Sequence, residues 1–315
     1  MILGFDIGGT KCAVIAANVE RDKIEITAKE KIPTDLKIKP EEMLDRLIAL
    51  ADKLCGGDRP ERIGISCGGP LDPEKGVILG PPNLPGWDCV PIADIINKHY
   101  GVPVRLQNDA NACAVAEWKF GAGRGFDNIV FLTFGTGLGA GLILGGKLYG
   151  GTNGNAGEVG HIRLEDVGPV GYGKAGSFEG FCSGGGIAQS GYALALEKSR
   201  QGEIPMYFKP GMKKEDVTAK SIAEAAKQGD KTALEVYRIC GEHLGKGLSV
   251  LIDILNPERI IIGSIFARSK DLLWSAAAKV IEKEALKCSA KCCEVVPCEL
   301  GEHIGDYAAV ATALL

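Results

Sequence analysis

The residues that could do chemistry most directly lie in a glycine-rich turn near the start of the chain, ILGFDIGGTKCAVIA at 2–16. The turn contains Asp6 and Lys11 between two apolar runs that read as strands. An aspartate among flexible backbone amides can hold a magnesium ion, while the N–H groups and a lysine contact phosphoryl oxygens. The segment therefore predicts a phosphate-binding hairpin. It is not a P-loop, because that motif needs four residues between its first glycine and its Gly-Lys pair and a helix after it.

A similar hairpin is expected near the middle of the chain. Residues 128–134 form an apolar, β-branched run, 135–141 (GTGLGAG) read as a turn, and 142–144 are apolar again. Either turn alone could be an ordinary glycine hairpin, since short motifs often mislead. The two copies together indicate two similar halves that face each other.

Strands and helices alternate along the chain, which predicts an α/β architecture with mixed sheets in two domains. Helices are expected at 41–54, 91–100, 110–120, 187–198, 232–255 and about 306–315, and strands at 23–27, 63–67, 102–106 and 259–262. A helix that leads into a strand is expected over 276–290. The segment 200–214 mixes charge, glycine and proline without periodicity, so we expect a mobile loop there. A cleft between the two domains would be the natural ligand site.

Length and composition place the chain among globular proteins. Its 315 residues, 45% of them hydrophobic, are enough for about two domains with cores of their own. A net charge of −4 and a pI near 5.7 argue against a basic patch for a nucleic-acid backbone. No apolar run approaches the roughly 20 residues that cross a bilayer, and no leader precedes the strand at Ile2. We therefore expect a cytosolic protein without membrane or nucleic-acid partners.

The chain has 11 cysteines, an odd number without a secretory signal, which indicates reduced thiols. Four of them cluster near the end: Cys288, Cys292, Cys293 and Cys298. They lack the paired CxxC spacing of a zinc ribbon. We interpret them as buried or surface thiols, to which the spacing assigns no role.

Seven motifs follow one another along the chain: FDIGGTK, GGPLD, PNLPGW, QNDANACAVAE, TFGTGLGAG, GEVGH and NPERIIIG. In this order they resemble the ROK family, which contains bacterial sugar kinases and related repressors. The likeness runs from Phe5 to the segment 301–309. It implies an α/β fold of two ribonuclease-H-like domains of the actin or hexokinase type, with an interdomain active-site cleft. The last helix would return to the first domain, so the domains would comprise 1–112 with 302–315, and 113–301.

The resemblance implies that Asp109, in the QNDAN stretch, is the catalytic base. A carboxylate there could accept the proton of a sugar hydroxyl as that oxygen attacks the γ-phosphorus. The alternative is that Asp109 only caps the helix that begins there. The helix dipole would favour its charged form and make it a weak base. A weak base suffices, because phosphoryl transfer depends mainly on positioning and charge neutralisation.

The resemblance also assigns residues to the nucleotide. Asp6 would orient Mg²⁺ and the attached phosphates, directly or through water, although an aspartate in a hairpin can also merely stabilise the turn. Thr136 and Gly137 would close over the phosphates from the opposite domain. Gly263 would lie on the adenine side, where many relatives continue with another glycine and this chain has Ser264. The complete set implied for ATP is Asp6, Gly8, Gly9, Thr10, Lys11, Thr136, Gly137 and Gly263.

The sugar site follows from the same motifs. A hexose presents hydroxyls that both donate and accept, so carboxylates, amides and an imidazole suit it better than apolar surface. Such a site discriminates strongly, because a missing hydroxyl leaves a buried partner unpaired. The implied set is Gly69, Asn83, Asn108, Asp109, Glu158, His161 and Glu179.

One departure from the family pattern concerns metal binding. Many relatives carry a zinc motif, CxCGxxGCxE, after the GH histidine, and here the aligned stretch at 170–179 is VGYGKAGSFE. The three cysteine positions are occupied by Val170, Tyr172 and Ser177. One histidine cannot complete a tetrahedral zinc site, so we expect no structural zinc. The loop should instead be held by packing of Tyr172 and Phe178, with His161 left to serve the sugar.

These residues together predict an ATP- and magnesium-dependent hexose kinase, with the 6-hydroxyl of glucose as the default acceptor. Domain closure would exclude water, which otherwise competes as nucleophile. Fructose, mannose, allose and N-acetylmannosamine remain alternative substrates. A sugar-responsive repressor is a remote rival, because repressors carry a helix-turn-helix domain before the kinase-like part. A catalytically silent sugar-binding protein is a second rival, against which Asp6 and Asp109 argue. The family likeness favours a homodimer, whereas the use of polyphosphate and any regulation stay open.

Overall fold

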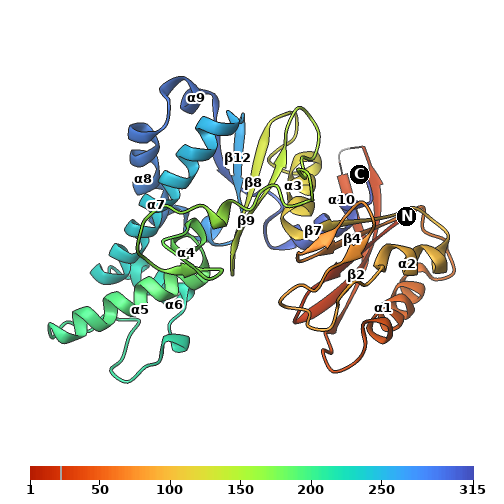
Figure 1. Cartoon of the computed structure of the whole chain (residues 1–315), viewed down its shortest axis with the longest axis horizontal. Helices are drawn as coiled ribbons and strands as arrows, with labels where there is room; N and C mark the ends of the chain where they lie inside the picture. The colour runs from red at the N-terminus through yellow and green to blue at the C-terminus, as the bar shows by residue number, and fades with distance from the viewer. Residues whose placement is uncertain (22) are drawn as a thin grey trace. The chain divides into compact units, whose positions relative to one another are not determined.

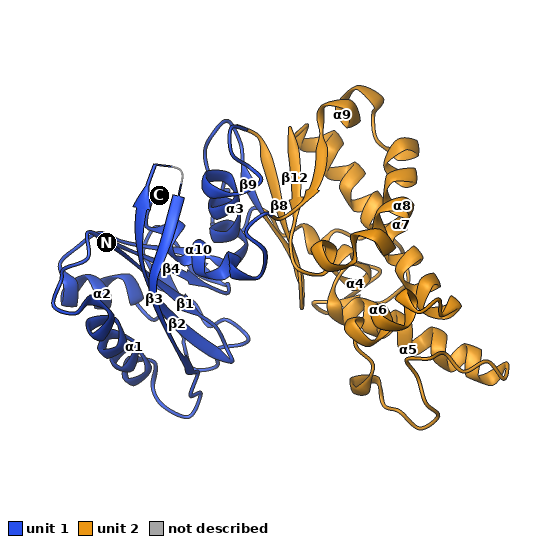
Figure 2. Ribbon diagram, turned by 180° about the vertical axis from the view of Figure 1, so that it is seen from behind, with its two compact units in different colours: residues 1–126, 141–156, 299–315 blue, residues 127–140, 157–298 orange. Residues whose placement is uncertain are grey.

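Two compact units make up the part of the chain that the computed structural model describes, residues 1–21 and 23–315. Unit 1 consists of Met1–Phe126, Gly141–Ala156 and Glu299–Leu315, and unit 2 of Asp127–Ala140 and Gly157–Cys298 (Figure 2). The domain bounds expected from the sequence, 1–112 with 302–315 and 113–301, stay a prediction. The compact units differ from them mainly in counting 113–126 and 141–156 with unit 1.

Unit 1 is built on a five-stranded sheet with the strand order β3-β2-β1-β4-β7 (Figure 1). Its elements are β1 (Ile2–Ile7), β2 (Lys11–Glu20), β3 (Lys23–Pro33), α1 (Pro40–Cys55), β4 (Arg62–Cys67), β5 (Leu71–Asp72), β6 (Val77–Ile78), α2 (Ile92–Tyr100), β7 (Val104–Asn108), α3 (Asp109–Phe120) and α10 (Ile304–Thr312). Strand β1 is antiparallel to β2 and parallel to β4. The hairpin expected at the start of the chain is therefore present.

Strand β3 is longer than the expected strand at 23–27. It pairs along the whole of β2, from Glu20 with Lys23 to Lys11 with Pro33. Its second half carries charged residues that lack an apolar alternation, so the sequence pattern ends before the backbone pairing does. An edge strand needs only one paired side and tolerates charge, which explains the difference.

Side chains alternate across the sheet of unit 1, as the two-residue repeat of a strand requires. Leu3, Phe5 and Ile7 are buried in one core with apolar residues of α1 and α2. Gly4, on the other face, lies so close to α10 that a Cβ there would be 2.9 Å from the Val310 nitrogen. The last helix thus packs on the first sheet, as the resemblance implied, and Asp6 shares its face of β1.

Unit 2 contains a four-stranded sheet with the order β13-β12-β8-β9. Its elements are β8 (Ile129–Phe134), β9 (Leu138–Ile143, which enters unit 1 after Ala140), β10 (Val170–Gly171), β11 (Lys174–Ala175), α4 (Phe178–Phe181), α5 (Gly184–Arg200), α6 (Ala219–Lys227), α7 (Lys231–Leu255), β12 (Arg259–Ile262), α8 (Ile265–Glu284), α9 (Lys287–Cys292) and β13 (Glu294–Pro297). Strand β12 is parallel to both β8 and β13. Written from the other end, β9-β8-β12-β13 corresponds strand by strand to β2-β1-β4-β7 of unit 1. The two expected similar halves are therefore present.

Two expected elements of unit 2 need correction, and one helix was missed. Strand β9 begins at Leu138, inside the turn expected at 135–141, because glycines there still pair with β8. The helix and strand expected over 276–290 are the end of α8 and the separate helix α9, with β13 following. Helix α6 was not expected, although Thr218 and Ser221 form a capping box at its start.

In residues 1–21 and 23–315, no helix has the length and apolar character needed to span a membrane.

Candidate active site

Three parallel strands of unit 1 end at the same edge of its sheet. Ile7 of β1 pairs with Cys67 of β4, and Cys67 pairs with Asn108 of β7. In open α/β sheets, ligands bind outside the carboxyl ends of the strands. The predicted residues Asp6, Gly69, Asn108 and Asp109 all lie at or just after these ends. The topology therefore brings them to one edge, as the motifs implied.

Asn83 joins this edge through close packing against glycines. A Cβ on Gly9 would lie 2.8 Å from the Asn83 Cβ, and a Cβ on Gly68 would lie 3.5 Å from Asn83 Oδ1. A side chain at position 9 would therefore displace Asn83. Thr10 and Lys11, at the other end of the turn, are exposed. The hairpin thus offers its backbone amides and one ammonium group next to Asn83.

At the start of α3, the structure assigns helix capping to Asn108 and leaves Asp109 available for another role. Asn108 is the N-cap residue, and its Oδ1 accepts a hydrogen bond of 2.8 Å from the Asn111 backbone N–H. Asp109 is the first residue of the helix, and its Oδ1 accepts one from the Ala110 N–H, also 2.8 Å. The capping role considered for Asp109 belongs to Asn108. The second oxygen of Asp109 is therefore not needed to begin the helix.

The pKa of Asp109 is raised, contrary to the expectation that the helix dipole would favour its charged form. Loss of hydration is the largest cause, and the hydrogen bond from Ala110 opposes it. By surface area Asp109 is exposed, so its carboxyl group is open to an incoming hydroxyl, and the rise in its pKa comes from the protein atoms that displace water around it. A carboxylate with a raised pKa is a stronger base than one on an open helix end.

Asp6 lies among charges that the sequence analysis did not foresee. Burial, followed by the nearby Asp306 carboxylate, raises its pKa from 3.8 to about 6, while Lys29 and Lys11 act in the opposite direction. Asp306 is only 5% exposed and forms an ion pair with Lys29. Nothing in the sequence around Lys29, in edge strand β3, indicates that it lies near Asp6. Asp306 could have been predicted as a site residue, because it is a lone aspartate in the otherwise apolar last helix.

The far end of α3 is held by a buried carboxylate, Glu117. Its Oε1 accepts a hydrogen bond from the Leu300 N–H (2.9 Å), and its Oε2 accepts from the N–H groups of Ala122 (2.8 Å) and Glu299 (3.3 Å). Burial raises the pKa of Glu117, and these donors oppose the rise. The contacts tie α3, which carries Asp109 at its other end, to the segment that leads into α10.

The sugar-binding residues predicted in unit 2 surround the start of α4. Glu179 in α4 accepts a hydrogen bond of 2.9 Å from the Leu138 N–H through its Oε2. A Cβ on Gly137 would lie 2.7 Å from the same oxygen, so the turn before β9 and Glu179 are in contact. His161 ends the short 3₁₀ helix Val159–His161, and both His161 and Glu158 are exposed. Thr136 and Gly137 thus share one region of unit 2 with the predicted sugar residues.

The loop that lacks the cysteine ligands is ordered by other means. Ser177, at the third cysteine position, caps α4 by accepting a hydrogen bond of 3.0 Å from the Gly180 N–H. Phe178 is fully buried, as expected, whereas Tyr172 is 78% exposed and meets the His161 ring in a T-shaped arrangement, with centroids 6.4 Å apart. Among the residues described, no group of three or more His, Cys, Asp or Glu could hold a metal ion. The absence of a structural zinc stays a prediction, which metal analysis of the purified protein would check.

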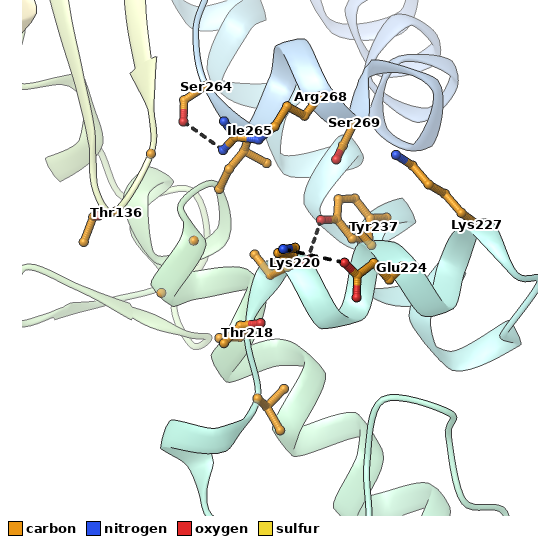
Figure 3. Close-up of a pocket in the computed structure, with 17 residues that line it drawn as sticks. Thr136, Thr218, Lys220, Glu224, Lys227, Tyr237, Ser264, Ile265, Arg268 and Ser269 are labelled. Atoms are coloured by element: carbon orange, nitrogen blue, oxygen red, sulfur yellow. Dashed lines mark hydrogen bonds and ion pairs between the residues drawn. The ribbon is translucent and has the colours of Figure 1, made fainter. Parts of the chain in front are cut away.

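Unit 2 also contains a cavity of about 780 Å³, a size typical of small-molecule sites (Figure 3). It is lined by the β8–β9 turn, the first turns of α5, helix α6, Tyr237 of α7 and the start of α8. Thr136, which was predicted to contact the phosphates, lines it. The α6 residues were missed, because that helix was not expected. Figure 3 shows the ion pair of Lys220 with Glu224 on this wall.

The backbone conformation of Ser264 explains why many relatives have a glycine at position 264. Its φ of +50° lies in the region that glycine adopts without strain. The serine remains compatible with the cavity, because its Oγ lies 3.2 Å from Arg268 Nη2, which donates to it. Ser264 and Arg268 both line the cavity. Gly263, the residue predicted for the adenine side, precedes Ser264 in the sequence and is not among the lining residues. The substitution strains the backbone without filling the cavity.

The chain is similar to known proteins over nearly its whole length. A family model described as the ROK family matches residues 2–314. A glucokinase of Streptomyces coelicolor is 32% identical over 280 residues, 89% of this chain and 86% of that protein. A ROK family glucokinase of Streptomyces griseus, solved with glucose and AMPPNP, is 30% identical, with a TM-score of 0.77 and 99% of each chain covered. The transcriptional regulator NagC of Escherichia coli is 31% identical over 258 residues, 80% of this chain and 61% of the regulator.

Proposed function

Because the chain belongs to the ROK family, we propose that it is a kinase that transfers the γ-phosphate of ATP to a hexose. The family fold, two ribonuclease-H-like domains of the actin or hexokinase type, agrees with the strand order that recurs in the two units. The glucokinase relatives support sugar phosphorylation. The 6-hydroxyl of glucose is the acceptor we propose. The observation that carries the proposal is the Asp109 carboxylate, dehydrated and not required as a helix cap, at the carboxyl edge that also holds Asp6.

Asp109 would act as the general base. As the sugar oxygen forms its bond to the γ-phosphorus, the hydroxyl proton passes to a carboxylate oxygen of Asp109, and the bond to the β-phosphate oxygen breaks to release ADP. The transition state is loose, so positioning and charge stabilisation carry most of the rate enhancement. The raised pKa of Asp109 favours this proton transfer, because it brings the base closer to neutral pH.

Asp6 and the hairpin 8–11 would hold the phosphates. The crowding of Asp6 with Asp306 raises the pKa of Asp6 and makes the location favourable for a cation, so the residues fit a magnesium ion. When bound with ATP, Mg²⁺ would neutralise charge on the phosphates. Thr136 and Gly137 would contact the same phosphates from unit 2. The cavity in unit 2 would receive the nucleoside, since it combines apolar walls with hydroxyl and charged groups.

The sugar would be held by the set predicted from the motifs. Its hydroxyls would exchange hydrogen bonds with amide, carboxylate and imidazole groups, which reject an acceptor that lacks a hydroxyl. These residues are Gly69, Asn83, Asn108, Asp109, Glu158, His161 and Glu179. Fructose, mannose, allose and N-acetylmannosamine are the alternative acceptors. We further propose a homodimer in the cytosol, which light scattering and cell fractionation would check.

A sugar-sensing regulator is the second candidate, because NagC, 31% identical over 258 residues, comes close to the 32% over 280 residues of the Streptomyces coelicolor glucokinase. ADP release in the presence of ATP, Mg²⁺ and each sugar in turn separates the two functions. We expect sugar-dependent ADP release, fastest with glucose. Binding of a sugar without ADP release for any of the five hexoses would reject the kinase and favour the sensor.

Asp6 leads to a pH prediction. Its pKa is raised from 3.8 to about 6, so the folded protein binds this proton more tightly than the unfolded chain. The contribution of Asp6 to the free energy of unfolding should therefore decrease as the pH rises from about 4 to about 6, and stay constant above. Asp109 and Glu117, whose pKa values are also raised, add slopes of the same sign. Urea unfolding across this range should therefore show a less steep decrease in Asp6→Asn than in wild type. An equal slope in both proteins would contradict the assignment.

The same titration affects catalysis. Phosphate-bound magnesium needs the anionic form of Asp6, so kcat/KM for ATP should fall as the pH drops below about 6. A pH profile that is flat between about pH 5 and 7 would exclude Asp6 from this role.

The cavity in unit 2 allows a test by blocking. Gly185 lies in the first turn of α5, and a Cβ built on it meets Ser183 and Thr136 atoms only at 3.9 Å. Gly185→Ala should therefore leave KM for ATP within about twofold. Gly185→Leu should raise it by about tenfold or more, because the larger side chain would occupy part of the space proposed for the nucleoside. Steady-state kinetics decide, and an unchanged KM for ATP in the leucine variant would place the nucleotide elsewhere.

A further inference from the structure

The segment 162–177, which we term the linking loop, connects His161 with the helix that carries Glu179. We propose that Glu165 is a positioning residue, which fixes the linking loop to α7 and thereby orients His161 and Glu179 for the sugar. The inference rests on the proposed function, since it concerns the same sugar-binding residues. Glu165 would thus order a loop that has no cysteine ligands to hold it.

Glu165 contacts two residues of α7. Its carboxylate forms an ion pair with Lys246, and its Oε1 lies 3.3 Å from His243 Nε2. The His243 side chain is only 12% exposed, and its Nδ1 lies 2.8 Å from the Ile239 carbonyl oxygen. This Nε2 atom is buried and has no hydrogen-bond partner of good geometry among the described residues, so its contact with Glu165 is one of packing and charge. Loss of the Glu165 carboxylate would remove the polar group that covers this nitrogen.

His243 also contacts the helix that carries Glu179. The rings of His243 and Phe181 stack with centroids 3.5 Å apart and an interplanar angle of 8°. Phe181 is buried and lies two residues after Glu179 in α4. One side chain of α7 therefore contacts both the linking loop and the helix of the sugar-binding carboxylate. Movement of Glu165 away from α7 would loosen both.

A second anchor holds the far part of the linking loop. The Gln189 side chain in α5 accepts a hydrogen bond from the Val170 N–H (3.1 Å) and donates one to the Val170 carbonyl oxygen (2.9 Å). At the stem, the N–H groups of Leu164 and Glu165 both donate to the Gly176 carbonyl oxygen, at 2.8 and 3.1 Å. Near His161, the Lys174 ammonium donates to the His161 carbonyl oxygen at 2.7 Å. The loop therefore has a closed stem, and Glu165 links that stem to α7.

The size of the effect separates the proposal from an ordinary surface ion pair. The side chains of Glu165 and Lys246 are 38% and 41% exposed, and such pairs alone change an equilibrium by no more than about fivefold. The nearly buried His243 adds to this. We therefore expect about a tenfold effect on sugar affinity when the carboxylate is lost. The nucleotide cavity has other walls, so affinity for ATP should change little.

The experiment uses Glu165→Ala and Glu165→Gln, the second of which keeps the side-chain shape. Glu242→Gln is the matched control, because it removes an ion pair with Arg238 on the same helix without touching the loop. Both Glu165 variants should raise KM for glucose by about tenfold, with kcat and KM for ATP within about twofold. Hydrogen exchange of the free protein should become faster in 162–177. Glu242→Gln should behave as wild type.

A charge exchange tests the contact itself. The single variants Glu165→Lys and Lys246→Glu should each accelerate exchange in the linking loop, and the double variant should restore part of its protection. Unchanged exchange in all Glu165 variants, or faster exchange with an unchanged KM for glucose, would overturn the proposal. Wild-type protein that phosphorylates no sugar would instead overturn the proposed function. In that case calorimetric sugar binding by wild type and Glu165→Gln decides whether Glu165 positions the site.

Discussion

Replacing Asp109 by Asn is expected to lower kcat by about 10²- to 10⁴-fold, the usual contribution of a general base. Asparagine keeps an oxygen that can accept the hydrogen bond from the Ala110 N–H, and Asn108 still caps α3. The fold should therefore persist, and the sugar should still bind. The loss should appear in turnover because the amide cannot take the hydroxyl proton. Steady-state ADP release, together with calorimetry for the sugar, measures both quantities.

The matched control for this variant is Asp94→Asn. Asp94 is an exposed acidic residue in the first turn of α2 in the same unit, so its replacement changes a helix start without changing the proposed base. It should leave kcat within about twofold. Full turnover in Asp109→Asn would remove Asp109 from the mechanism. Loss of sugar binding together with turnover would instead assign it to the sugar alone.

Replacing Lys29 by Met is expected to destabilise the protein by about 3 kcal/mol, because it takes the ammonium partner from the buried Asp306 carboxylate. Asp306 has 7% of its side chain exposed, and Lys29 has 23%. The carboxylate would keep only the longer contact with the exposed His303, whose Nδ1 lies 3.8 Å away. Its charge would also lie next to Asp6, whose ionisation Asp306 already opposes. Urea unfolding near pH 7 gives the loss as a change in the free energy of unfolding.

Two further variants give this prediction its controls. Lys53→Met removes an exposed ion pair with Glu30, whose side chain also lies on β3, and should cost less than about 1 kcal/mol. The double variant Lys29→Met with Asp306→Leu removes both charges and should recover most of the stability. A cost for Lys29→Met no larger than that for Lys53→Met would show that Asp306 is hydrated in solution.

Local pattern carried most of the fold prediction. The hairpin of β1 and β2 and the helix α1 combine a strong periodicity with glycine or proline at their ends, so they could be placed to within a few residues. Strand β3 could not, because its pairing with β2 depends on backbone hydrogen bonds that charged residues do not reveal. Helix α6 was missed although a capping box marks its start. The capping box could have predicted the helix, but it comes directly after a loop whose sequence has no periodicity, and the helix was overlooked.

The site divides in a similar way. Motifs predicted Asp6 and Asp109 as site residues, but they could not decide between Asn108 and Asp109 as the cap, since adjacent residues of both types suit that position. Only the geometry of the first turn separates them. The partner of Asp306 lies 277 residues away in the sequence, beyond any local pattern. The direction of the Asp109 pKa shift also required the surrounding atoms, because dehydration outweighs the helix dipole.

The close approach of α10 to Gly4 has a consequence for biosynthesis. Strand β1 precedes α10 in the sequence, so the strand is synthesised before the helix that covers it. Until α10 has been translated, one side of the nascent β-sheet therefore stays uncovered, with its glycines facing outward. Chaperones that recognise incomplete chains would find that surface on a product truncated before α10, and a stop codon introduced ahead of Ile304 should yield an aggregating polypeptide.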